Sequence, residues 1–150
     1  MMTKAQKKAR QVLRKHNLHL APININKIMK AEKLVLDEWE FRGRVKEVYV
    51  GDRVGIKLNT DLKKKRELIA HALGHHFLHI GNHLYFDSVN QFAIFKQEQE
   101  AQCFASELLM PTDLLKKMEH RSLKDISNHF NLSANFARFG LEVLKEDMWR

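Results

Sequence analysis

The sequence predicts an α+β domain in which a small antiparallel sheet packs on helices. Three observations support this fold class: helical spacing over residues 1–31, strand-like segments between residues 34 and 58, and helical patterns again from residue 62 onward. The length of 150 residues suits one domain with one hydrophobic core. We therefore expect a single domain, 1–150, with a basic helical segment (1–31), a sheet plus central helices (32–111) and a C-terminal helical part (112–150).

Two helices are expected at the start of the chain. The first covers residues 3–17, with small and apolar side chains on one side, basic residues on the other, and Asn17 as its end. Pro22 is placed to open a second, shorter helix that ends near Ala31. Its positions spaced for burial are Ile25, Ile28 and Met29.

Strand-like segments follow these helices. An extended stretch begins at Leu34, and the segments Glu47–Val50 and Val54–Leu58 flank a loop of hairpin length, residues 51–53. Hairpin strands pair in opposite directions, so we expect a small antiparallel sheet.

Two longer helices are expected in the middle of the chain. The first runs from about Leu62 to His79, with capping residues at 59–61 and Gly81 placed to end it. Residues 82–95 are predicted to be mostly loop. The second helix runs from about Lys96 to Leu109 and stops at Pro111.

Three shorter helices are expected after Pro111. Two of them, Leu123–Phe130 and Ala134–Lys145, have the proportions of a helix-turn-helix, with Ser122 and Ser133 as caps. DNA binding by this pair is the least favoured function, because the second helix carries few side chains that read bases. Its apolar residues are typical of packing instead.

The positive charge of the chain is confined to its beginning. The formal net charge is +8, and eight basic residues precede the first acidic residue, Glu32. Residues 31–150 are therefore formally neutral, and we interpret the basic segment as a surface for a partner or for solubility rather than for nucleic acid. The single cysteine, Cys103, excludes an internal disulfide and indicates a reducing compartment. With no apolar run near 18 residues and no signal peptide, we expect a soluble, cytoplasmic protein without membrane contact.

A cluster of histidines marks the candidate functional site. His71 and His75 lie four residues apart on a predicted helix, which places the rings about 5–6 Å apart, close enough for both to bind one metal ion. Nine histidines would form roughly half of one such pair by chance, whereas the sequence has three pairs, the others being His75/His79 and His79/His83. His71 and His79 cannot share an ion, because eight residues of helix span about 12 Å. A third ligand must come from elsewhere.

The helix predicted around residues 97–109 offers two carboxylates. Glu98 shares a face with Ala101, Gln102, Ala105 and Leu109, whereas Glu100 points some 200° away. A carboxylate on a largely apolar face is partly buried unless it is paired or bound to a cation, which favours Glu98 as a ligand. The alternative is that Glu98 only interacts with the helix dipole.

These residues resemble the ImmA/IrrE-type metallo-endopeptidases, a zincin-like family. The blocks Ala70–His79 and Glu98–Pro111 carry the resemblance, which extends from about residue 18 to residue 145. In the family the first block reads His-Glu-x-x-His, and the second supplies a glutamate three residues before an alanine. The resemblance implies His71, His75 and Glu98 as ligands of zinc, with manganese or iron left open. It also implies a protein substrate, typically a helix-turn-helix repressor of a phage, mobile element or stress regulon.

The sequence departs from the family at the catalytic position, because residue 72 is alanine. In such peptidases the metal lowers the pKa of a water, and the glutamate at this position takes its proton as the general base. Losing a general base lowers the rate by a factor on the order of 10²–10⁴. Ala72 is either a deliberate substitution that leaves a substrate uncleaved, which we favour because its surroundings remain peptidase-like, or the mark of a natural pseudo-peptidase that binds a repressor.

Four further positions in this region carry expectations. His76 and His79 are expected to pack or form hydrogen bonds rather than bind metal. Gly74 costs about 1 kcal/mol relative to alanine in a helix interior, which indicates that the Glu98 helix packs closely over it. Cys103 is expected to be a buried structural thiol.

An edge of the predicted sheet is suited to holding an extended substrate, although the sequence does not identify the edge strand.

Overall fold

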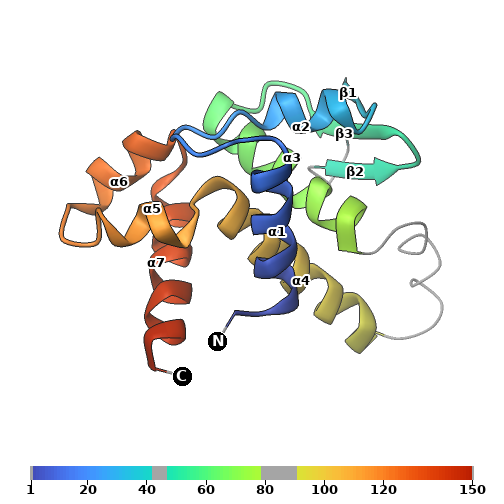
Figure 1. Ribbon diagram of the computed structural model, residues 1–150. Coiled ribbons are helices and arrows are strands. Elements are labelled where there is room, and N and C mark those ends of the chain that lie inside the picture. The colour runs from blue at the N-terminus through green and yellow to red at the C-terminus, as the bar shows by residue number, and fades with distance from the viewer. Residues whose placement is uncertain (1, 42–46, 79–90, 150) are drawn as a thin grey trace.

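The computed structural model describes residues 2–41, 47–78 and 91–149, and within these ranges the fold is α+β, as predicted (Figure 1). The sheet and α2 lie at one end of the molecule, and α5, α6 and α7 lie at the other. The elements in chain order are α1 (Lys4–Lys15), α2 (Ile25–Ala31), β1 (Val35–Trp39), β2 (Glu47–Val50), β3 (Arg53–Lys57), α3 (Leu62–Leu78), α4 (Gln91–Leu109), α5 (Thr112–Lys116), α6 (Leu123–Phe130) and α7 (Ala134–Trp149).

Helix α1 begins and ends at the residues that its sequence indicates. Thr3 and Gln6 form a capping box, in which the Thr3 hydroxyl accepts from the Gln6 N–H at 3.2 Å and the Gln6 side chain accepts from the Thr3 N–H at 2.7 Å. Asn17 follows the last turn in a left-handed conformation with φ of 54°, as expected for a helix end.

Helix α2 begins later than predicted. It starts at Ile25 instead of at Pro22, because Asn24 caps it by accepting a hydrogen bond from the Lys27 N–H at 3.3 Å. The bond between Ala21 and Pro22 is cis, and Pro22 lies in a bend that precedes the helix. The predicted burial of this helix is confirmed for Ile25, Ile28 and Met29.

The three-stranded sheet is mixed, which corrects the prediction of an antiparallel one. Its order is β1-β3-β2. Strands β2 and β3 form the predicted antiparallel hairpin, with Val48 opposite Gly55, but β1 joins β3 in parallel, with Val35 opposite Arg53. The two-residue turn after Val50 dictates only the β2–β3 hairpin, whereas the pairing of β1 is with β3, which does not follow it directly in the chain.

The two central helices confirm the prediction in part. Asp61 caps α3 by accepting from the Lys64 N–H at 2.9 Å. The predicted end of α3, at His79 and Gly81, lies outside the described residues. Helix α4 starts at Gln91, five residues before the predicted start, so residues 91–95 are helical rather than loop, while 82–90 are outside the described ranges. The apolar run 92–95 has no periodicity that distinguishes a helix from other structure.

The C-terminal helices follow the predicted pattern, with one longer element. Ser122 caps α6 through a hydrogen bond from the Asp125 N–H at 3.1 Å, and the Ser133 hydroxyl accepts from the Phe136 N–H at 3.2 Å at the start of α7. Helix α7 extends to Trp149, beyond the predicted end at Lys145.

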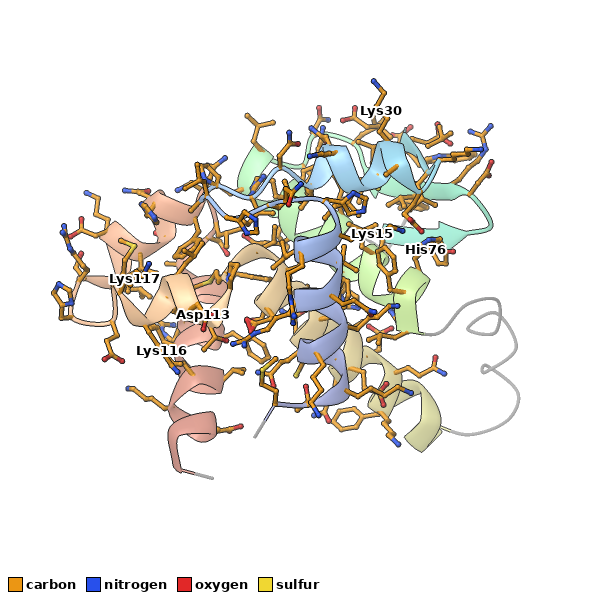
Figure 2. The ribbon with its side chains drawn as sticks, in the orientation of Figure 1. Lys15, Lys30, His76, Asp113, Lys116 and Lys117 are labelled. Carbon is orange, nitrogen blue, oxygen red and sulfur yellow. The ribbon has the colours of Figure 1, made fainter. Side chains whose placement is uncertain are left out.

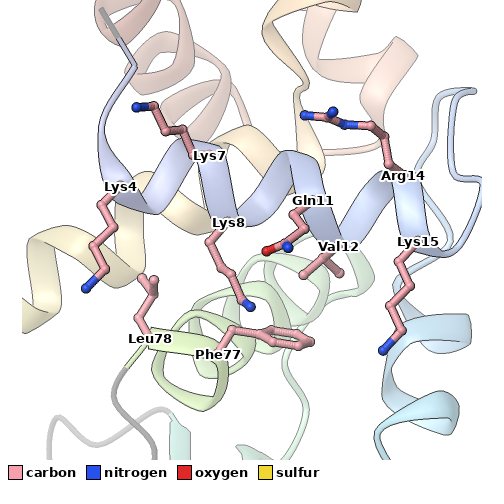
Figure 3. Close-up of a pocket in the computed structure, with 9 residues that line it drawn as sticks. All are labelled: Lys4, Lys7, Lys8, Gln11, Val12, Arg14, Lys15, Phe77 and Leu78. Carbon is pink, nitrogen blue, oxygen red and sulfur yellow. The ribbon is translucent and has the colours of Figure 1, made fainter.

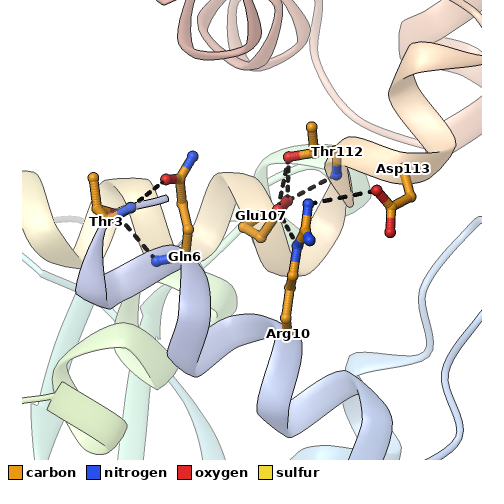
Figure 4. A network of polar contacts seen from close by, with 6 residues as sticks. All are labelled: Thr3, Gln6, Arg10, Glu107, Thr112 and Asp113. Atoms are coloured by element: carbon orange, nitrogen blue, oxygen red, sulfur yellow. Dashed lines mark hydrogen bonds and ion pairs between the residues drawn. The ribbon is translucent and has the colours of Figure 1, made fainter. Parts of the chain in front are cut away.

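A buried carboxylate connects α1 to α4 and α5 (Figure 4). Glu107 is 3% exposed and accepts hydrogen bonds from the Thr112 N–H at 2.8 Å and the Arg10 Nε–H at 3.0 Å. Burial raises the pKa of Glu107, and its bonds to Thr112 and Arg10 oppose that rise. One hydrophobic core contains residues from the N-terminal, central and C-terminal parts of the chain. Among the described residues, no helix is long and apolar enough to cross a membrane.

Candidate metal centre

Helix α3 presents the two predicted histidine ligands side by side. The His71 and His75 rings stack with centroids 5.0 Å apart and an angle of 22° between their planes, as the spacing of one helical turn requires. Their side chains retain 17% and 10% exposure, so both rings lie at the edge of the core with some access to solvent.

Helix α4 places Glu98 against both rings. One carboxylate oxygen lies 2.9 Å from His71 Nε2, and the other lies 2.9 Å from His75 Nε2. The three potential ligand atoms all lie within 4.8 Å of one another. The structure therefore brings together the three residues that the sequence nominated, from two segments more than 20 residues apart.

The electrostatics of this cluster keep Glu98 ionised. Hydrogen bonds from His71 and His75 hold the pKa of the Glu98 carboxyl well below its ordinary range, although partial burial acts in the opposite direction. Two imidazole nitrogens and one carboxylate oxygen are the donor set of catalytic zinc sites, which leave a further position open for water or substrate. Because half of the Glu98 side chain is exposed, the cluster is accessible from solvent.

Glycine at position 74 allows the two ligand-bearing helices to meet. A Cβ atom added to Gly74 would lie 2.8 Å from both the Cα and the carbonyl oxygen of Ala101. The prediction that the Glu98 helix packs closely over this glycine is therefore confirmed. This close approach brings His75, the residue after Gly74, next to Glu98, which lies three residues before Ala101 on α4.

Position 72 lies inside the core, where Ala72 is 1% exposed. The nearest acidic residue on the same helix is Glu67, which accepts hydrogen bonds from the Ser133 N–H at 2.8 Å and the Ser133 hydroxyl at 3.0 Å. Glu67 is thus engaged at the start of α7, and Glu98 is engaged with the two histidines. Neither of these carboxylates is placed to replace a general base at position 72.

His76 has a hydrogen-bonding role, as expected, but its partners were missed in the sequence. The Tyr49 hydroxyl lies 2.6 Å from His76 Nδ1, and His76 Nε2 lies 2.9 Å from a carboxylate oxygen of Glu32. With the Nε2 proton donated to Glu32, Nδ1 accepts from Tyr49. Burial raises the pKa of Tyr49, and the Glu32 charge adds to this effect. These contacts attach β2, and the end of α2 at Glu32, to α3. Tyr49 lies 27 residues from His76 in the sequence and Glu32 lies 44 residues away, so no local pattern reveals either partner.

Glu100 and Cys103, which the sequence did not favour as ligands, take no part in the described cluster. Glu100 lies 4.0 Å from Lys96 Nζ and is not among the grouped ligand atoms. Cys103 is only partly buried, where the sequence predicted a buried thiol, and it packs against the hydrophobic core. His79 lies outside the described residues.

Comparisons with known proteins agree with this geometry. The profile of a family described as the IrrE N-terminal-like domain matches residues 16–142. A relative named Metallopeptidase ImmA, from Bacillus subtilis (strain 168), is 28% identical over 134 residues, which cover 83% of this chain and 76% of the relative. The matched region contains all three candidate ligands and position 72.

Proposed function

The chain belongs to the IrrE N-terminal-like domain family of ImmA/IrrE-type metallopeptidases, and on this premise we propose that it binds one zinc ion through His71, His75 and Glu98. The observation that carries the proposal is the convergence of the three ligand atoms within 4.8 Å of one another. The family implies a divalent metal, and this donor set suits zinc.

We propose that this chain binds a protein substrate without cleaving it efficiently. When bound, zinc supplies a Lewis acid that polarises a scissile carbonyl. His71, His75 and Glu98 would hold the ion, but Ala72 has no group that can accept a proton from the attacking water. The substrate we propose is a helix-turn-helix repressor, and support for it comes from the resemblance of the two sequence blocks to the ImmA/IrrE family.

The strand that we propose to hold the substrate is β2. It lies at one edge of the sheet in the order β1-β3-β2, and an edge strand can pair with an extended peptide. The other edge strand is β1, but β2 is connected to the metal helix through the Tyr49 contact with His76, the neighbour of His75. This contact favours β2 as the strand that aligns a peptide beside the candidate metal ligands.

Metal analysis tests the zinc site. We expect one zinc ion per chain by elemental analysis, and loss of that ion in the variants His71→Ala and Glu98→Gln. His120→Ala and Glu100→Gln are the matched controls and should retain zinc, since both residues lie outside the cluster. A chain that binds no zinc, or that loses it equally in the controls, would contradict the proposed site.

Restoring the carboxylate tests the proposed reaction. Zinc-loaded Ala72 protein, immobilised as bait, is used to capture partner proteins, and these are incubated with Ala72→Glu protein with and without zinc. We expect zinc-dependent cleavage at a limited site, faster than with the Ala72 protein by a factor on the order of 10²–10⁴. Ala72→Gln, which matches the volume but cannot take a proton, is the control and should remain inactive.

The same experiment, together with the native codon at position 72, separates the two explanations of Ala72. If a partner binds specifically but the zinc-loaded Ala72→Glu protein leaves it intact, the protein is a non-catalytic binder that has lost more than its base. If cleavage appears, the codon at position 72 in the native gene decides between a deliberate substitution and a natural one.

A further inference from the structure

Helix α1 and the end of α3 enclose a basic groove, which we call the α1 groove (Figure 3). Its volume is about 1120 Å³, and none of the three candidate metal ligands lines it. Its lining residues are Lys4, Lys7, Lys8, Gln11, Val12, Arg14, Lys15, Phe77 and Leu78. The groove is therefore distinct from the candidate metal centre, although residues of α3 contribute to both.

The charge of the α1 groove is positive and uncompensated within the described residues. Five of the nine lining side chains are cationic, none is acidic, and none of the five forms an ion pair with a residue that the structure describes. Figure 3 shows Lys4, Lys8 and Lys15 directed to the side of α1 that faces Phe77 and Leu78. Cations near a helix N-terminus oppose the helix dipole, and the first turn of α1 contains no acidic residue to offset them. Helix stability therefore does not explain the cations Lys4, Lys7 and Lys8, whereas Arg14 and Lys15 lie in the last turn, where a cation favours the dipole.

The apolar side chains of the α1 groove lie between its cations. Val12 is 4% exposed, and Phe77 and Leu78 are partly buried and pack against the core. The Phe77 ring is already in contact with neighbours: Phe104 stacks on it with centroids 5.7 Å apart, His76 meets it edge-on at 5.0 Å, and Lys8 Nζ lies 5.9 Å from its centroid. An apolar base with cationic walls suits an amphipathic acidic ligand.

We propose that the α1 groove binds an acidic polypeptide segment of a partner protein, with carboxylates against Lys4, Lys8 and Lys15 and apolar side chains against Phe77 and Leu78. The cations from Lys4 to Lys15 follow α1 over roughly 16 Å, the length of about three helical turns or of about five extended residues. A polypeptide fits better than single-stranded nucleic acid, because Phe104 already stacks on one face of Phe77, and the other apolar residues of the groove, Val12 and Leu78, are aliphatic and offer no ring on which a base could stack. The binding needs no metal, so it is independent of the proposed peptidase function.

The experiment measures binding of a synthetic probe to the full chain in EDTA. The probe is a fluorescein-labelled peptide of about 12 residues, rich in glutamate, with leucines at helical spacing. Its two comparison probes replace every Glu by Gln, or every Leu by Ser. We expect fluorescence anisotropy to show binding of the acidic peptide, weaker binding of the Ser peptide and no binding of the Gln peptide. Added salt should weaken the binding of the acidic peptide, because exposed charges are screened.

Matched charge reversals locate the binding surface. The groove variant is Lys4→Glu/Lys8→Glu/Lys15→Glu. The control is Lys30→Glu/Lys116→Glu/Lys117→Glu, which changes the net charge by the same amount at positions outside the groove. Lys30 lies on α2, Lys116 ends α5 and Lys117 follows it (Figure 2). We expect the groove variant to bind the acidic peptide about ten-fold more weakly, and the control to stay within about two-fold, since exposed charge pairs contribute locally. If circular dichroism shows that the groove variant is unfolded, the triple Lys→Gln variant replaces it, with an expected loss of about three-fold.

Two results would overturn the proposal. Equal loss in the groove variant and the control would show that only net charge attracts the peptide. Tighter binding of a labelled oligonucleotide than of the acidic peptide, lost in the groove variant alone, would assign the surface to nucleic acid instead. Metal binding by His71, His75 and Glu98 affects neither result, because EDTA is present throughout.

Discussion

Gly74→Ala tests the idea that the contact between α3 and α4 positions the metal ligands. The added Cβ would lie 2.8 Å from two backbone atoms of Ala101, whereas ordinary contacts begin at 3.4 Å. Backbone atoms in a helix interior cannot rotate away as a side chain can, so the two helices must separate by about 0.6 Å or tilt. Glu98 lies one turn from Ala101 and would move with α4.

The expected magnitudes follow from this displacement. Overpacking a core costs about 1–3 kcal/mol, and the better helix propensity of alanine returns about 1 kcal/mol, so the free energy of unfolding should fall by about 1 kcal/mol. Zinc sites tolerate ligand displacements of about 0.2 Å, which is well below the required shift. We therefore expect zinc binding to be affected more strongly than stability, with the affinity for zinc reduced at least about ten-fold.

The assays are urea unfolding without metal and competition for zinc with a chromophoric chelator. Gly140→Ala is the control, because its Cβ would meet the flexible end of Met110, with Sδ at 3.0 Å and Cε at 3.1 Å. In this control the free energy of unfolding should change by no more than about 1 kcal/mol. Its zinc affinity should not change. If Gly74→Ala bound zinc as tightly as the unmodified chain, the argument that helix spacing sets the site would be wrong.

Two further predictions concern the polar contacts around α3. Glu67→Ala removes the acceptor of the Ser133 N–H and hydroxyl, so the free energy of unfolding should fall by about 1–3 kcal/mol in urea titrations. The control Glu142→Ala, which removes a carboxylate at an exposed position of α7, should change it by less than about 0.5 kcal/mol. Similar losses in both variants would refute the assigned role of Glu67. A second prediction concerns the raised pKa of Tyr49. Because of it, the unfolded chain loses the Tyr49 proton at lower pH than the folded chain does. The stability due to neutral Tyr49 is therefore complete below pH 10.0 and is lost as the pH rises through the pKa of the folded chain. Tyr49→Phe should flatten that decline in unfolding measurements at alkaline pH, and an unchanged decline would contradict the prediction.

The candidate metal centre and the α1 groove share one helix. His75 and Leu78 lie three residues apart on neighbouring faces of α3, so the proposed zinc site and the proposed peptide-binding surface both reach the C-terminal end of this helix. A partner seated in the groove would be held next to the metal site without contacting its ligands. Acidic segments flanking a cleavage site would then increase the local concentration of substrate, an effect that the metal-free binding assay isolates from catalysis.

Local patterns explain why much of the fold could be predicted. The starts of α1 and α6 depend on hydrogen bonds between residues three apart, and such caps are visible in the sequence. The same locality holds for the stacked rings of His71 and His75, which one helical turn brings together. The prediction failed where the local pattern was ambiguous, as for the apolar start of α4, and where the contact was not local, as for the parallel pairing of β1.

The sequence by itself determined the identity of the three candidate ligands, the missing carboxylate at position 72 and the location of the excess positive charge, because each is a matter of residue type and spacing. Only the tertiary structure decided that Glu98 meets both histidines, that β1 and β2 form the sheet edges, and that His76 bonds to Tyr49 and Glu32. The physical reason is that these contacts join segments far apart in the chain, so they depend on how closely whole elements pack. The absence of a side chain at Gly74 permits one such approach, and through it the candidate metal centre forms.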